Sequence, residues 1–70
     1  MLFHFCAQYR MQTQHGRPLF DEVVITVEAA NEDEARSMAL DEAYHQAPAW
    51  ASRPVCMYQM TAVEFELQQA

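Results

Sequence analysis

Five side chains of this sequence have the chemistry to bind a soft metal ion or to act together as a nucleophile and its base: His4, Cys6, His15, His45 and Cys56. Imidazole and thiolate groups are common zinc ligands in proteins. None of the spacings between these residues matches a zinc-binding motif, and in the register that the hydrophobic pattern favours Cys6 and Cys56 lie near opposite ends of the sheet. We therefore expect no metal site and no cofactor. A small metal or redox protein that uses His4, Cys6 and Cys56 is a separate hypothesis, which elemental analysis tests.

The same residues make poor candidates for catalysis. A Cys–His pair needs nearby donors that stabilise an oxyanion, and the sequence has one glycine and no glycine-rich loop to present backbone amides. Asp41 and Glu42 are neighbours on a helix, so they point in different directions and form no general acid/base pair. The sequence therefore predicts a protein that is not an enzyme and has no catalytic residue.

The charge of the chain is strongly negative and unevenly placed. Ten acidic residues are opposed by four arginines and no lysine, which gives a formal net charge of −6. A protein that follows the phosphates of nucleic acid needs a basic stripe, so we expect no direct nucleic-acid binding. Most of the acids fall between residues 21 and 42, where Arg36 is the only basic residue. Such a segment repels DNA and attracts a basic protein surface.

The acids near the predicted helix have two interpretations. One is a solvated helix N-terminus that is rich in acidic residues. The other is a docking surface for a basic partner, such as a nucleic-acid-binding defence complex of a host, or a local mimic of the DNA backbone. The partner-binding hypothesis uses seven residues: Glu32, Asp33, Glu34, Asp41, Glu42, Tyr58 and Met60.

Alternation of apolar and polar residues predicts three strands. The first covers residues 2–11 and the second covers residues 19–29. Residues 13–18 contain the glycine and a proline and form the turn between them. The third strand is expected at residues 55–67, because its last part, residues 63–67, alternates cleanly.

One helix is expected between the second and third strands. Asn31 is a good N-cap, and Glu34 stands three residues later as a capping-box partner would. Pro48 stops the helix. In the connection that follows, Trp50 is either a lid over the open end of the core or an exposed anchor for a partner.

These elements predict an α+β fold, with a single domain over residues 1–70. The order is β-β-α-β, in a three-stranded antiparallel sheet of spatial order 2-1-3 with one helix packed on one face. The space beneath the alanine-rich helix is filled by aromatic residues: Phe3, Phe5, Tyr9 and Phe65. The other face stays open, and by parity it carries side chains that a small domain rarely leaves unused: Leu2, Cys6, Phe20, Val24, Tyr58 and Met60. Tyr58 and Met60 either fill an imperfect strand or belong to the interaction face.

The remaining composition favours a cytoplasmic protein. The first residues lack the basic region of a signal peptide, and no apolar run is long enough to span a membrane. Two cysteines make no disulfide framework, so we expect reduced thiols. A chain of 70 residues buries a modest core, which makes homodimerisation a reasonable expectation.

The segment VEAANEDEAR at residues 27–36, a strand that runs directly into an alanine-rich helix, is similar to small proteins of phages and mobile elements, including anti-CRISPR proteins. Like them, the chain is short, acidic and expected to be β-β-α-β. The resemblance implies a stoichiometric inhibitor that blocks a nucleic-acid site or a partner surface on a host complex. It carries over no functional residues. The alternative is a homodimeric accessory or structural subunit with no inhibitory role.

Overall fold

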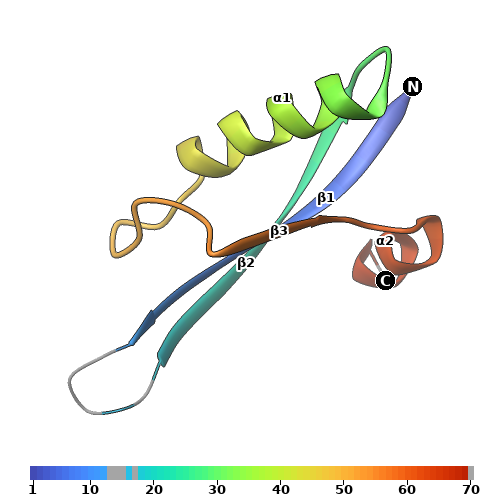
Figure 1. The fold of residues 1–70 in the computed structure, drawn as a ribbon. Coiled ribbons are helices and arrows are strands. Elements are labelled where there is room, and N and C mark those ends of the chain that lie inside the picture. The colour runs from blue at the N-terminus through green and yellow to red at the C-terminus, as the bar shows by residue number, and fades with distance from the viewer. Residues whose placement is uncertain (13–15, 17, 70) are drawn as a thin grey trace.

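Five elements make up the fold, and the computed structural model describes residues 1–12, 16 and 18–69 (Figure 1). They are the strands β1 (Leu2–Gln12) and β2 (Pro18–Glu28), the helix α1 (Glu32–His45), the strand β3 (Cys56–Gln59) and the helix α2 (Ala62–Gln69). The turn that was expected at residues 13–18 falls largely outside the described residues. Within it, Gly16 has a φ of +78°, a conformation that glycine adopts without strain.

The sheet has the predicted antiparallel pairing in the spatial order β2-β1-β3, so this part of the prediction is confirmed. Strands β1 and β2 pair along their whole length, from Leu2 opposite Glu28 to Gln12 opposite Pro18. Strand β3 pairs only with Phe5–Gln8. The hairpin therefore extends well past β3, and the molecule is elongated, with dimensions of 43 × 26 × 14 Å.

Helix α1 begins where the capping signal predicts. The Asn31 backbone is extended, and its side-chain oxygen accepts a hydrogen bond from the Glu34 amide at 2.9 Å. The Glu34 carboxylate reaches back to the Ala30 amide at 3.4 Å. The first contact satisfies an amide that the first turn leaves without a helical partner, and the second holds the residue before the N-cap, so together they fix the start of the helix.

The core lies between α1 and one face of the hairpin. Ala35, Ala39 and Ala43 are fully buried against strand residues that include Phe5 and Tyr9. The three small side chains let the helix axis approach the sheet, and the buried Tyr9 hydroxyl donates a hydrogen bond to the Ala43 carbonyl. Trp50 is half-buried and packs against this core, as expected of a lid.

The prediction of a long third strand is wrong. Strand β3 ends at Gln59, and residues 62–69 form α2. A capping box explains the difference: the Thr61 hydroxyl accepts from the Glu64 amide, the Glu64 carboxylate accepts from the Thr61 amide, and both distances are 3.1 Å. This pair starts a helix, and the alternation of residues 63–67 does not produce a strand.

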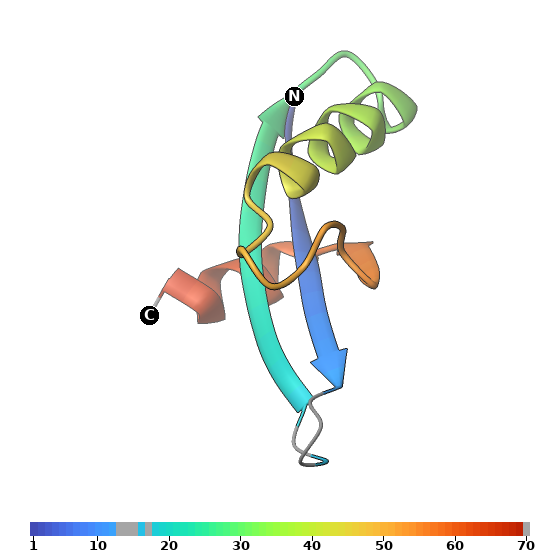
Figure 2. The same ribbon diagram turned by 90° about the vertical axis from the view of Figure 1, so that its left-hand side faces the viewer.

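The predictions of a single helix and of an open outer face are wrong for the same reason. Helices α1 and α2 lie on opposite sides of the sheet (Figures 1 and 2). Phe65, expected in the core under α1, instead stacks on His4 on the outer face, with ring centroids 3.7 Å apart and planes within 11°. Gln68 of the last turn donates to the Glu22 carboxylate at 3.4 Å. Part of the outer face is therefore covered.

Candidate functional site

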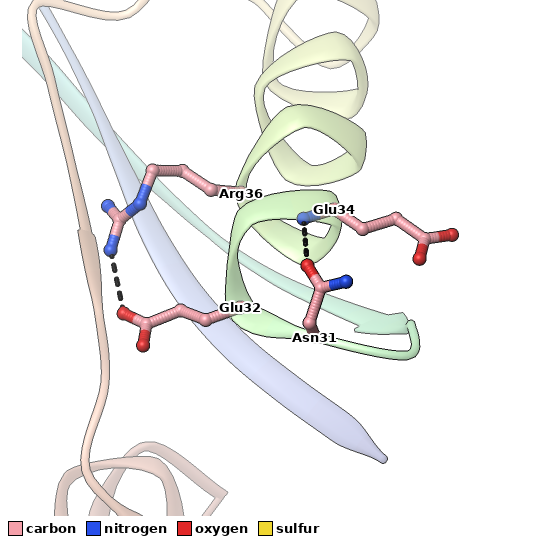
Figure 3. A network of polar contacts seen from close by, with 4 residues as sticks. All are labelled: Asn31, Glu32, Glu34 and Arg36. Atoms are coloured by element: carbon pink, nitrogen blue, oxygen red, sulfur yellow. Dashed lines mark hydrogen bonds and ion pairs between the residues drawn. The ribbon is translucent and has the colours of Figure 1, made fainter.

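The best candidate for a functional site is the exposed acidic surface of α1. Its first turn carries Glu32, Asp33 and Glu34, as Figure 3 shows for two of them, and all three are exposed. Carboxylates in this position are favoured by the positive end of the helix dipole, so the charge also supports the fold. The surface continues through Asp41 and Glu42, which are exposed as well. We call these five residues the acidic surface.

Little positive charge offsets this surface. Arg36 is the only basic residue of α1 apart from His45 at its end, and its guanidinium bonds the Glu32 carboxylate at 3.1 Å (Figure 3). The Arg36 guanidinium carbon also lies 5.7 Å from the centre of the Phe5 ring. The carboxylates of Asp33 and Asp41 make no hydrogen bond or ion pair with any described residue, although the Asp41 carbonyl bonds the His45 ring at 3.0 Å. Both carboxylates are thus free to meet a partner.

The acidic surface consists of two groups of carboxylates on α1, one in the first turn (Glu32, Asp33 and Glu34) and one near the end (Asp41 and Glu42). Asp33 and Glu42 are nine residues apart, which is about 13 Å along a helix at about 1.5 Å per residue. The Debye length is about 10 Å at 0.1 M salt and about 3 Å at 1 M. The carboxylates within each group therefore add their fields at moderate ionic strength, whereas the two groups are largely screened from each other.

The structure does not bring Tyr58 and Met60 together with the acidic surface. Tyr58 is opposite Cys6 in the sheet, and the Met60 amide bonds the His4 carbonyl at 2.8 Å, so both residues belong to the face that α2 covers. Their predicted direction, away from α1, is confirmed. Met60 is only 5% exposed and Tyr58 is half-buried, so neither is a free surface anchor in this chain.

Tyr58 instead belongs to a small polar group around Cys6. Burial raises the pKa of the Cys6 thiol above its ordinary value of 9.0, although the hydrogen bond with Tyr58 acts in the opposite direction. The same hydrogen bond raises the pKa of Tyr58 to about 12. Gln8 donates to the Glu22 carboxylate beside this group at 3.1 Å. At neutral pH the thiol is protonated, which makes it a weak nucleophile.

The prediction that Cys6 and Cys56 lie near opposite ends of the sheet is wrong. Cys6 pairs with Tyr58 and Cys56 pairs with Gln8, so the two cysteines are diagonal neighbours on one face. Cys6 is buried and Cys56 is exposed, and both are free thiols. Over the described part of the chain, which excludes His15, no three His, Cys, Asp or Glu side chains are placed to hold a metal ion.

Sequence reasoning missed a second surface, which we call the hairpin arm: residues 10–12 and 18–21. It lies beyond the β1 residues that pair with β3, and it projects from the rest of the molecule in Figure 1. Met11 and Leu19 oppose each other on one face and are 38% and 40% exposed. On the other face Phe20 is 60% exposed and opposes Arg10. The strand pattern contains these residues, but only the short length of β3 shows that they are uncovered.

Comparison with protein-family models, curated proteins and solved structures gave no match to this chain. Across residues 1–12, 16 and 18–69, neither helix has the length and apolar character needed to cross a bilayer.

Proposed function

We propose that this protein is a non-enzymatic binding protein that acts by occupying a basic surface of another protein. The observation that supports the proposal is the exposed acidic surface of α1, in which Glu32 is the one carboxylate paired with an arginine over the described residues. Two of its carboxylates, those of Asp33 and Asp41, make no hydrogen bond or ion pair with any described residue. An array of this kind raises the rate of encounter with a positively charged surface and disfavours negatively charged ones.

The kind of partner follows from the chemistry of such surfaces. Exposed Lys and Arg side chains gather in proteins where they hold phosphate groups, and a carboxylate array competes for the same side chains. The resemblance to anti-CRISPR proteins points the same way. We therefore propose a phage- or mobile-element inhibitor that works in the cytoplasm and blocks the nucleic-acid site of a host defence complex. In this proposal the protein itself binds no nucleic acid.

A pull-down from bacterial lysate tests the proposal. Tagged protein is incubated at low salt, and the retained proteins are identified by mass spectrometry. We expect a nucleic-acid-binding complex that is released when the salt is raised toward 1 M, because the charges are then screened within about 3 Å. Recovery of the tagged protein alone would argue against a basic partner.

Two charge variants make the test specific. The double variant Asp33→Lys, Asp41→Lys removes the two unpartnered carboxylates and changes the net charge from −6 to −2. The control variant Ser52→Lys, Glu66→Lys, Gln69→Lys reaches the same net charge at exposed positions outside α1. We expect the first variant to bind at least about tenfold more weakly and the control to bind nearly as well as wild type. If both variants weakened binding equally, the loss of affinity would be due to the change in net charge and not to the two carboxylates of α1.

A homodimeric accessory subunit is the second candidate, and the hairpin arm favours it. Met11, Leu19 and Phe20 expose large apolar side chains on both faces of the arm, a pattern that is typical of contact surfaces. Sedimentation equilibrium separates the two candidates. A tight dimer that dissociates on Phe20→Lys favours the accessory subunit, and a monomer favours the inhibitor.

A further inference from the structure

The backbone hydrogen bonds show which way each residue of the hairpin faces. In an antiparallel sheet, the amide and carbonyl of one residue point to one neighbouring strand and those of the next residue point to the other. The carbonyls of His4 and Gln8 accept from β3 and its flanking residue, with Met60 and Val55 as donors, both at 2.8 Å. Even-numbered residues of β1 therefore bond toward β3.

The odd-numbered residues of β1 then bond to β2. Met1 and Ala29 lie just beyond the strands and confirm this parity. The Met1 amino group donates to the Ala29 carbonyl at 3.2 Å, and the Ala29 amide donates to the Met1 carbonyl at 3.0 Å. In β2, the residues whose backbone groups bond to β1 are therefore those opposite odd-numbered positions, such as Ile25 opposite Phe5. The alternate residues turn their backbone groups away from the sheet: Phe20, Glu22, Val24 and Thr26.

This outer edge of β2 is long and almost unprotected. The Glu22 amide bonds the Asp21 side chain at 2.8 Å, but no described residue pairs with the backbone of Phe20, Val24 or Thr26. The pairing with β1 runs over eleven residues of β2 without a bulge. Natural edge strands are usually blocked by lysines, prolines or bulges. Strand β2 has no lysine and no bulge, and its devices of this kind are the proline at its start and the charged side chains of Asp21, Glu22 and Glu28.

The charge of β2 determines which kind of strand pairs favourably with this edge. The strand carries Asp21, Glu22 and Glu28 and no basic residue. A second copy of β2 would bring three more acids to the same edge, which disfavours self-pairing. An added strand with lysine or arginine side chains would instead form favourable cross-strand pairs.

We propose that the outer edge of β2 is a strand-pairing site for an extended, lysine- or arginine-bearing segment of a partner protein. Main-chain hydrogen bonds to the residues around Val24 supply affinity, and the acids of β2 supply selectivity. The inference rests on the proposed function for the existence of a protein partner. It adds a second contact, separate from the acidic surface of α1.

A synthetic peptide of about seven alternating lysine and threonine residues is a suitable probe, because it spans about 24 Å as a strand at about 3.4 Å per residue. It is titrated into the ¹⁵N-labelled full chain and followed by NMR. We expect amide shifts along β2 and slower hydrogen exchange at Val24 and Thr26. The control peptide has the same side chains and charge but is N-methylated at alternate amides. Since it loses two or three main-chain hydrogen bonds, it should bind at least about tenfold more weakly.

A backbone variant tests the same edge from the other side. Val24→Pro removes an outward-facing amide, a change that edge strands tolerate, and it should weaken binding of the unmethylated peptide by at least about tenfold. If the variant does not fold, the comparison of the methylated and unmethylated peptides on the wild-type protein still tests the proposal.

Three results would overturn the inference. The first is equal binding of the two peptides, and the second is shifts confined to α1. The third is concentration-dependent protection of Val24 and Thr26 without peptide, which would assign the edge to a second copy. Shifts confined to α1 would leave the proposed function intact. Failure of the α1 charge variant would remove the proposed function, and the comparison of the two peptides would then be the separate test of strand pairing at the edge.

Discussion

Replacing Phe65 with alanine should release α2 from the sheet. The helix has eight residues and no buried side chain, and a helix of that length is unstable on its own in water. Its described contacts with the sheet are the Phe65–His4 stack and the hydrogen bond from Gln68 to Glu22. Because the second is exposed and long at 3.4 Å, the aromatic stack provides most of the attachment.

The magnitude follows from burial and stacking. Full burial of a phenylalanine side chain contributes about 1.5–3 kcal/mol, so the half-buried Phe65 contributes about 1 kcal/mol. An aromatic pair adds about 0.5–1.5 kcal/mol beyond its buried area. Phe65→Ala should therefore cost about 2 kcal/mol, and the undocked state should become about thirtyfold more populated, since about 1.4 kcal/mol corresponds to a factor of ten.

Thiol labelling measures this population. Cys6 is fully buried on the face that α2 covers, whereas Cys56 is exposed, so Cys56 provides an internal reference for reagent activity. We expect Cys6 to react about thirtyfold faster in Phe65→Ala, by local opening, with the Cys56 rate unchanged. Leu67→Ala is the matched control, because Leu67 is on the same helix and 70% exposed. An unchanged Cys6 rate, or an equal effect of Leu67→Ala, would refute the docking of α2 through Phe65.

Three further predictions concern stability and are measured by chemical or thermal denaturation. Asn31→Ala should cost about 1 kcal/mol through loss of the N-cap, and Asn31→Gly should recover part of it; a neutral alanine variant would contradict the cap. Tyr9→Phe should cost about 1–2 kcal/mol because the Ala43 carbonyl loses its buried donor, which lowers Tm by roughly 4–8 °C per kcal/mol. Burial raises the pKa of the Cys6 thiol, and the hydrogen bond with Cys6 raises the pKa of Tyr58. The stability that these two protonated groups contribute is therefore complete below pH 9.0 and is lost as the pH rises from there toward about 12. Cys6→Ala should remove the first part of this alkaline loss, and an unchanged pH profile in that variant would argue against the buried thiol.

The hairpin and α1 were predictable from local sequence because their signals do not compete. Residues 2–11 alternate with period two, and the pairing of β1 with β2 follows from a single short connection. Asn31 and Glu34 mark the start of α1 through the predicted N-cap bond, in which the Asn31 side chain accepts from the Glu34 amide. The five members of the acidic surface were therefore placed correctly on one helix.

Helix α2 was missed because two local signals conflict at the same residues. Residues 63–67 alternate as a strand does, while Thr61 and Glu64 have the spacing of a capping box. Tyr58 and Met60 are exposed if residues 63–67 continue the strand and are covered if those residues form α2. Their exposure could therefore not be predicted without knowing which signal prevails. Strand β3 pairs with Phe5–Gln8 in a register that differs from the predicted one and places Cys56 diagonally beside Cys6. Because β3 is short, it also leaves the hairpin arm uncovered.

A competition measurement tests the central claim most directly. The complex captured from lysate is loaded with its nucleic acid, and this protein is added at increasing concentration while bound nucleic acid is followed by fluorescence anisotropy. If the acidic surface occupies the basic site, nucleic acid is displaced stoichiometrically, and the Asp33→Lys, Asp41→Lys variant displaces it only at much higher concentration. A ternary complex that retains both the nucleic acid and this protein would contradict the account.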